Sequence, residues 1–336
     1  MPAHLRPHRQ ESFRWLSWIA GMVPATQLSA YFRKETTMPL SHPTPANSTP
    51  QVQPPIWVAQ HVLERLLDPD HDPVDWIALS AIEWLERLKL PETSILEAAK
   101  QSGFPELYRP LNRYELLDFC ARTDVPFKWR FAAMMAFGGR SRRKATGCAL
   151  WACVPAIEAL AKKLPTMTRR QAYRAFRYLI ASAQLEGMGP SFFTKVMFFF
   201  GCSGAYILDQ WLAKSILALN RANWTVGADG EPVFAIAADN YIRLVAASKP
   251  AAIDRTMTED DYEKYCLAVE SLVAVLGRKD GADTERWLFS QPQSAWRRFL
   301  AKLSWKRPDR RLSKPAPQPP SSVSRPIAAR GDQASL

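Results

Sequence analysis

The most restrictive feature of this sequence is the spacing of its apolar residues, which follows a helical period over most of the chain. Within 258–276, apolar and aromatic side chains recur every three to four residues, at Tyr262, Tyr265, Cys266, Val269, Leu272, Val273 and Leu276. Such spacing predicts an amphipathic helix with one buried face. Because similar patterns with short breaks fill residues 56–304, the sequence predicts an all-α domain there.

The individual helices can be placed from start signals and from the apolar period. Asp72-Pro73 is expected to open a helix with one apolar face, formed by Ile77, Ala81, Trp84, Leu85 and Leu88. Further helices are predicted over 93–102, 113–122, 127–137, 148–163, 168–183, 209–220, 238–247 and 258–276. The stretch 225–237 contains an Asp-Gly turn and predicts a β-hairpin.

Both ends of the chain differ in composition from the middle. Residues 1–55 end in a Pro/Ser/Thr-rich run, and residues 305–336 are basic and Pro-rich, so we expect disordered extensions around a domain at 56–304. The apolar run at 15–23 is too short to cross a bilayer, so no membrane insertion is expected. A further hypothesis is that the N-terminal segment and the basic tail bind a membrane surface. Deleting residues 1–37 would test it, because DNA binding by the core should survive the deletion.

The charge of the chain indicates an anionic partner. Forty-four Lys and Arg against 32 Asp and Glu give a net charge of +12, which favours nucleic acid or a membrane surface. Between residues 130 and 184, eleven basic residues stand against one acid, Glu158, for a local charge of +10. Solvated helix faces or a phosphate-facing surface would both produce this pattern.

Cysteine and histidine usage restricts the possible chemistry. The five cysteines are scattered and odd in number, which suits a reducing cytoplasm, and they lack zinc or iron–sulfur spacing, so we expect no metal and no cofactor. All five histidines lie in the first 71 residues. Chemistry later in the chain would therefore depend on carboxylates, Lys, Tyr or Ser rather than on a His base.

The stretch "QLEGMGPSFFTKVMFFFG" (184–201) predicts a tight turn between two helices. Gly187 and Gly189 would let the backbone take positive φ and let another chain approach closely. Met188 would fill the core, and Pro190 suits a first helical turn. The helix N-terminus that results can bind phosphate through outward amide N–H groups. A Gly-x-Gly turn alone is weak support for such a site.

This stretch, followed by "YILDQWLAKSIL" (206–217), resembles the helix-hairpin-helix DNA glycosylase superfamily, and within it a bacterial branch with an 8-oxoguanine DNA glycosylase-like fold. The positions that match the superfamily signature are Leu185, Gly187, Gly189, Ser191 and Asp209, and Asp209 follows Ser191 by 18 residues. "DTERWLF" (283–289) is similar to the last helix of that branch. The resemblance implies an enzyme that flips a damaged or modified base out of duplex DNA and hydrolyses its glycosidic bond, in base excision repair or in defence against modified phage DNA.

Two departures from the superfamily pattern bear on the mechanism. Ser191 stands where bifunctional members carry a lysine, and a serine hydroxyl cannot form a Schiff base with the opened sugar. The resemblance therefore implies a monofunctional enzyme without lyase activity, with Lys195, one helical turn further on, as a partial substitute. Pro190 removes one possible phosphate-binding amide.

Asp209 has a structural and a catalytic interpretation. As the residue before "QWLAKSIL" it is a good N-cap. Glycosidic cleavage builds positive charge on the sugar, and a carboxylate near C1′ would stabilise that charge and orient or deprotonate the attacking water. The two roles are compatible. A non-catalytic helix-hairpin-helix protein that only binds DNA is the alternative.

The remaining candidate residues serve DNA binding and base recognition. We expect double-stranded DNA as partner, a monomer, and phosphate contacts from Gly187, Met188, Gly189, Arg140, Arg142, Arg143 and Lys144. Phe137 and Trp151 are candidates for the base pocket, although ordinary core packing also explains them. Gly138 and Gly139 indicate a close backbone approach to an unidentified neighbour.

Overall fold

The structure is a computed structural model that describes residues 57–67, 79–90, 93–138, 144–185, 188–237, 239–245, 252–289 and 294–305. The chain divides into two compact units, Met1–Gln51 and Val52–Leu336, and all described residues lie in the second. The predicted extensions, apart from Trp305, and the predicted helix start at Asp72-Pro73 lie outside the described residues.

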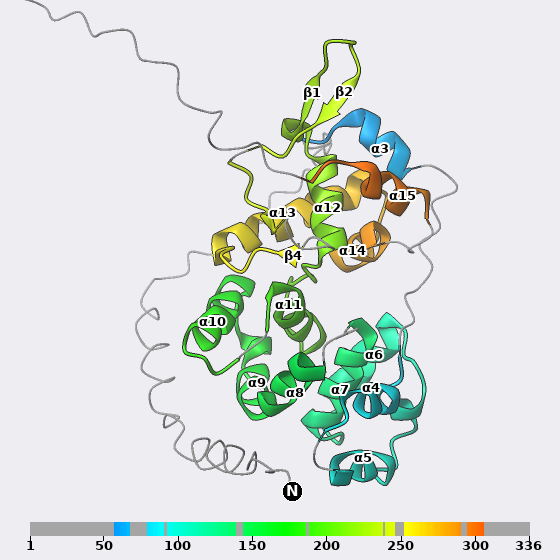
Figure 1. Ribbon diagram of the computed structural model, residues 1–336, viewed down its shortest axis with the longest axis vertical. Helices are drawn as coiled ribbons and strands as arrows, with labels where there is room; N and C mark the ends of the chain where they lie inside the picture. Colours follow the sequence, from blue (N-terminus) through cyan, green and yellow to red (C-terminus); the bar gives the residue numbers. More distant parts are fainter. Residues whose placement is uncertain are drawn as a thin grey trace, which may run out of the picture. The chain divides into compact units, whose positions relative to one another are not determined.

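The described part of the second unit is mainly helical, which confirms the predicted all-α class (Figure 1). Its helices are α3 (Gln60–Leu66), α4 (Ala81–Leu88), α5 (Thr93–Lys100), α6 (Arg113–Ala121), α7 (Phe127–Gly138), α8 (Lys144–Ala152), α9 (Val154–Ala161), α10 (Arg169–Ala181), α11 (Pro190–Phe199), α12 (Gln210–Leu219), α13 (Glu259–Val275), α14 (Gly281–Phe289) and α15 (Ala295–Lys302). Two short antiparallel pairs accompany them: β1 (Trp224–Val226) with β2 (Pro232–Phe234), and β3 (Leu244–Val245) with β4 (Ala252–Ile253). The first pair is the predicted hairpin.

Side-chain caps fix the helix starts. Ser80, Asn112, Thr168 and Thr258 each form a capping box with the residue three positions on, and Thr168 is the predicted cap of α10. Such a box pairs two amide groups that would otherwise lack a partner in the first turn. The local sequence thus determines where these helices begin.

Two predicted helices differ from the structure. The segment 148–163 is divided between α8 and α9, because Pro155 lies in the first turn of α9 and favours a new helix start. The helix predicted over 238–247 is wrong, since residues 239–245 contain no helix and end in β3. There the Asn240 side chain accepts a hydrogen bond from the amide of Ile242, a local turn that competes with helix.

The core around the later helices is built on α12. Every residue of this helix from Leu212 to Leu219 is buried. It packs against α3, α13, α14 and α15, while α10 packs against α11 and α13. Because α12 is enclosed by these helices from Leu212 onward, the core anchors the helix that begins directly after Asp209.

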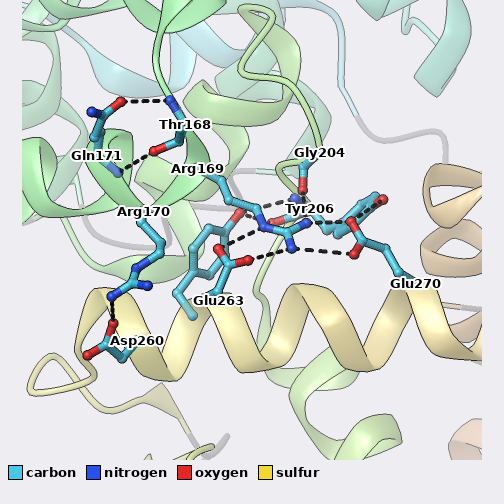
Figure 2. A network of polar contacts seen from close by, with 10 residues as sticks. Thr168, Arg169, Arg170, Gln171, Gly204, Tyr206, Asp260, Glu263 and Glu270 are labelled. Carbon is cyan, nitrogen blue, oxygen red and sulfur yellow. Dashed lines mark hydrogen bonds and ion pairs between the residues drawn. The ribbon is translucent and has the colours of Figure 1, made fainter. Parts of the chain in front are cut away.

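The basic surplus between residues 130 and 184 is neutralised in part by acids from α13. Arg169 donates to Glu263 at 2.6 and 2.9 Å, also pairs with Glu270, and donates to the carbonyl of Gly204 at 3.0 Å (Figure 2). Arg170 pairs with Asp260 in the same view. Arg174 and Arg177 share Glu259, at 2.9 and 3.3 Å. For these four arginines, pairing between helices explains the charge run.

Replacing Arg169 should therefore lower stability and leave DNA affinity intact. Arg169→Met removes charge-assisted hydrogen bonds to two carboxylates, worth about 1.5–3 kcal/mol for a partly buried guanidinium. Arg170→Gln, at an exposed pair, is the matched control and should cost less than about 1 kcal/mol. Urea unfolding and a DNA titration measure the two quantities. A loss of affinity with unchanged stability would return Arg169 to the phosphate-facing interpretation.

Candidate functional site

The turn before α11 is anchored in the core by its central methionine. Leu185 and Met188 are both fully buried, which confirms that Met188 fills the core. Gly187 lies outside the described residues. Gly189 has φ −112° and ψ 175°, so the positive φ predicted for it is wrong, because this extended conformation is open to any residue. Within the part of the chain that the structure describes, and leaving out its two chain neighbours, a Cβ on Gly189 would meet no atom within 4 Å, so the described residues leave space for a partner on this side of the turn.

Helix α11 begins at the predicted Pro190, and its first turn is well ordered by hydrogen bonds. The carbonyl of Gly189 accepts from the amides of Phe192 and Phe193, at 2.9 and 3.2 Å. The half-buried Ser191 lies in this turn. A helix N-terminus carries partial positive charge and suits an anion such as a phosphate group.

Asp209 is the N-cap of α12, and only one of its carboxylate oxygens does the capping. Oδ1 accepts from the amides of Trp211 and Leu212, at 2.8 and 2.9 Å. Among the described residues, Oδ2 has no hydrogen bond and the carboxylate forms no ion pair. Capping therefore fixes the orientation of the half-buried carboxylate and leaves one oxygen for a second partner.

Lys195 lies on α11 with its amine buried close to this carboxylate. The residue is 8% exposed, and Nζ donates to the carbonyl of Ser191 at 3.0 Å. Burial lowers the pKa of Lys195, and the negative charges of Asp209 and Glu285 act in the opposite direction. No carboxylate of the described part of the chain lies within salt-bridge distance of this amine. A buried amine without a paired acid is costly, and such groups are concentrated at functional sites.

The close approach expected near residues 137–139 occurs at Gly138, the last residue of α7, where the Lys195 side chain is the neighbour. A Cβ at Gly138 would lie 2.3 Å from Cε of Lys195 and 3.0 Å from its Nζ. The absence of a side chain at this position therefore makes room for the lysine. The sequence predicted a close approach here but not its partner.

A buried ion pair between α6 and α14 was not predicted from the sequence. Arg113, on α6, donates to both oxygens of Glu285, on α14, with one contact of 3.0 Å. The guanidinium also lies 4.1 Å from the ring centroid of Phe198. Burial raises the pKa of Glu285, and Arg113 lowers it. Local sequence signals could not reveal this pair, because 172 residues separate its members.

The residues predicted for the base pocket and for phosphate contacts do not form one cluster in the described part of the structure. Phe137, the residue before Gly138, is buried, and its ring packs edge-on against Phe199 at 5.4 Å. Trp151 packs against Trp84 and Trp129, between α4, α7 and α8. Arg140, Arg142, Arg143 and the side chain of Lys144 lie outside the described residues. The role of these residues in binding stays a prediction.

A cavity of about 810 Å³ lies beside the C-terminal end of α11. Phe198, Phe199 and Phe200 line it together with Arg130 and Lys162. Neither Asp209 nor Lys195 is among its lining residues, so it is separate from the carboxylate and the amine.

In the described ranges, no group of three or more His, Cys, Asp or Glu side chains is placed to hold a metal ion. No described helix is both long enough and apolar enough to span a bilayer.

Comparison with known proteins identifies the family. Residues 68–289, which are 222 of the 336 residues, match the model of a family described as "Putative 8-oxoguanine DNA glycosylase OGG-like protein". A search of curated proteins and a search of solved structures found no match. The family match supports a DNA glycosylase-like function and, with it, binding to DNA. The chain belongs to this OGG-like DNA glycosylase family.

Proposed function

We propose that this protein is a monofunctional DNA N-glycosylase that flips a damaged or modified base out of double-stranded DNA and releases it by water attack. Two observations carry the proposal: one oxygen of the Asp209 carboxylate is left over by capping, and the Lys195 amine is buried within the electrostatic influence of that carboxylate without forming a salt bridge to it. A capping role alone explains Oδ1 of Asp209. It does not explain a lysine buried without a paired acid beside it.

The turn at Gly189 and the start of α11 are suited to hold the DNA backbone. Space on one side of Gly189 and the positive end of α11 together favour a phosphate group there. A backbone held at this turn would bring an extruded nucleotide toward α11 and the start of α12. The target base is stacked in a duplex, so extrusion must precede the chemistry.

Asp209 would act on the sugar and on the water. As the glycosidic bond breaks, positive charge develops near C1′, and Oδ2 can stabilise that charge or accept a proton from the attacking water. Because Oδ1 is fixed by two amides, the carboxylate needs little reorganisation during the reaction. Ser191 supplies no amine, so the sugar would not be captured covalently at that position.

The Lys195 amine would tune the electrostatics of the same site. A protonated amine at this position can stabilise negative charge on the departing base. Gly138→Ala should displace this amine, since the new Cβ would overlap Cε. We expect base release to slow by about 10- to 100-fold, the order reported for small misplacements. Stability should stay unchanged or rise slightly, because the change is Gly to Ala at a helix end.

A double variant provides the control for this effect. If Gly138→Ala acts by moving Lys195, it should add little to the loss caused by Lys195→Met, because changes at touching residues are not additive. Fully additive losses in single-turnover base release would show that Gly138 acts by another route.

The proposed function is tested by direct detection of the released base. Duplexes carrying 8-oxoguanine, alkylpurines, uracil or hypermodified cytosines are incubated with the protein, and free bases are identified by mass spectrometry. We expect one class of base to be released in multiple turnovers. Tight binding of every duplex with no released base would instead support the alternative, a non-catalytic helix-hairpin-helix protein.

A further inference from the structure

The segment that leads into Asp209 is extended, buried and held by side chains rather than by a β-ladder. Tyr206, Ile207 and Leu208 are all buried and belong to no helix or strand. Buried backbone amides and carbonyls need partners. Here five of these groups are paired with the side chains of four residues from α11, α13 and α14.

Two tyrosines of α13 hold the first part of the segment. The hydroxyl of Tyr262 accepts from the amide of Tyr206 at 3.1 Å and donates to its carbonyl at 2.7 Å. The hydroxyl of Tyr265 donates to the carbonyl of Ile207 at 2.6 Å. Both tyrosines are fully buried, and burial raises the pKa of each, which keeps the hydroxyls protonated.

An acid of α14 holds the other side of Ile207. Its amide donates to Oε2 of Glu285 at 3.3 Å, and Glu285 is oriented by Arg113. Gly281, the first residue of α14, lets the segment approach closely, since a Cβ there would lie 2.1 Å from the hydroxyl oxygen of Tyr206.

Thr194 connects the two halves of the motif. Its hydroxyl donates to the carbonyl of Pro190, at the start of α11, at 2.7 Å. The same oxygen accepts from the amide of Leu208, the residue before Asp209, at 3.0 Å. One buried hydroxyl therefore ties the start of α11 to the segment that leads into Asp209.

We propose that Thr194, Tyr265 and Glu285 are positioning residues. They hold the Asp209 carboxylate at a fixed position relative to the turn before α11. This inference rests on the proposed function, because it assigns these residues to the placement of a carboxylate that acts on DNA. A displacement of about 1 Å in a reacting group can slow catalysis by about 10²-fold. Small changes at the anchors should therefore alter the rate of base release more than DNA affinity.

Thr194 and Thr284 provide a matched pair of variants. Both are fully buried, and each donates to the carbonyl four residues earlier, at 2.7 and 3.0 Å. Only Thr194 also accepts from the segment before Asp209. Thr194→Val should slow single-turnover base release by about 10- to 100-fold with unchanged DNA affinity, and Thr284→Val should leave the rate unchanged.

Thr194→Ser separates positioning from a general loss of stability. Serine keeps the hydroxyl but removes a buried methyl group, so the melting temperature should fall while the rate stays near that of the wild type. Hydrogen exchange at the amide of Leu208 gives a readout without substrate. We expect this amide to be protected in the wild type, Thr194→Ser and Thr284→Val, and exposed in Thr194→Val.

The outcomes distinguish a failure of this inference from a failure of the proposed function. Each duplex that the wild type processes is also assayed with Asp209→Asn. If Asp209→Asn is inactive while Thr194→Val matches Thr284→Val, the positioning role is overturned. If rates simply follow melting temperatures across all variants, it is overturned as well. Wild-type protein that releases no base, or Asp209→Asn with full activity, would remove the proposed function itself.

Discussion

Asp209→Asn is expected to reduce base release by about 10²- to 10⁴-fold, the range associated with loss of a general base or of transition-state charge stabilisation. Asparagine is as good an N-cap as aspartate, and its Oδ1 can accept from the same two amides. The fold and the start of α12 should thus be retained. Single-turnover kinetics on a processed duplex measure the effect, with DNA affinity as the second observable.

The control for this prediction is Asp254→Asn. Asp254 is also half-buried, and its Oδ1 accepts from the amide of Thr256 at 2.8 Å, a comparable local turn away from the site. Its replacement should change neither rate nor affinity. If Asp209→Asn behaves like Asp254→Asn, the carboxylate is only a cap, and the alternative of a non-catalytic DNA-binding protein is favoured.

Arg113→Met is expected to give the largest loss of stability, about 3–5 kcal/mol, because it leaves the Glu285 carboxylate buried without its guanidinium. Arg109→Met is the matched control at an exposed pair with Glu115, and it should cost less than about 1 kcal/mol. Urea unfolding followed by circular dichroism measures both. Equal losses in the two variants would show that the buried pair contributes no more than a surface pair.

The loss in Arg113→Met should depend on pH. Burial raises the pKa of Glu285, and removing Arg113 takes away the group that lowers it. A carboxyl whose pKa is raised in the folded state binds its proton more tightly there than in the unfolded chain, so stability is gained as the pH falls toward that pKa. The difference from wild type should therefore shrink in mildly acidic buffer. A difference that grows on acidification would contradict the assignment.

Local signals in the sequence predicted most of the helices. Thr168 and Pro190 mark the starts of α10 and α11. Asp209 was singled out by the resemblance to the DNA glycosylase superfamily, whose signature places an Asp 18 residues after the position of Ser191. The helix starts depend on neighbouring residues and on short-range geometry. They could be recognised without knowledge of the tertiary structure.

Features that depend on distant contacts could not be predicted in this way. The sequence left the arginines of α10 open to two interpretations, solvated helix faces or a phosphate-facing surface, because the acids of α13 that pair with them lie far along the chain. The burial of Lys195 depends on Gly138 of another helix. The helix expected at 238–247 failed because Leu244 pairs with Ile253 as a strand.

The central claim, hydrolytic base release at Asp209, is tested most directly by the fate of the DNA strand. A processed duplex is incubated with wild-type protein under single-turnover conditions and analysed with and without hot alkali, and in parallel with borohydride. We predict strand breaks only after alkali and no covalent protein–DNA adduct, as expected for an abasic site left by water. Breaks without alkali, together with an adduct that is lost in Lys195→Met, would contradict this account and make Lys195 the nucleophile.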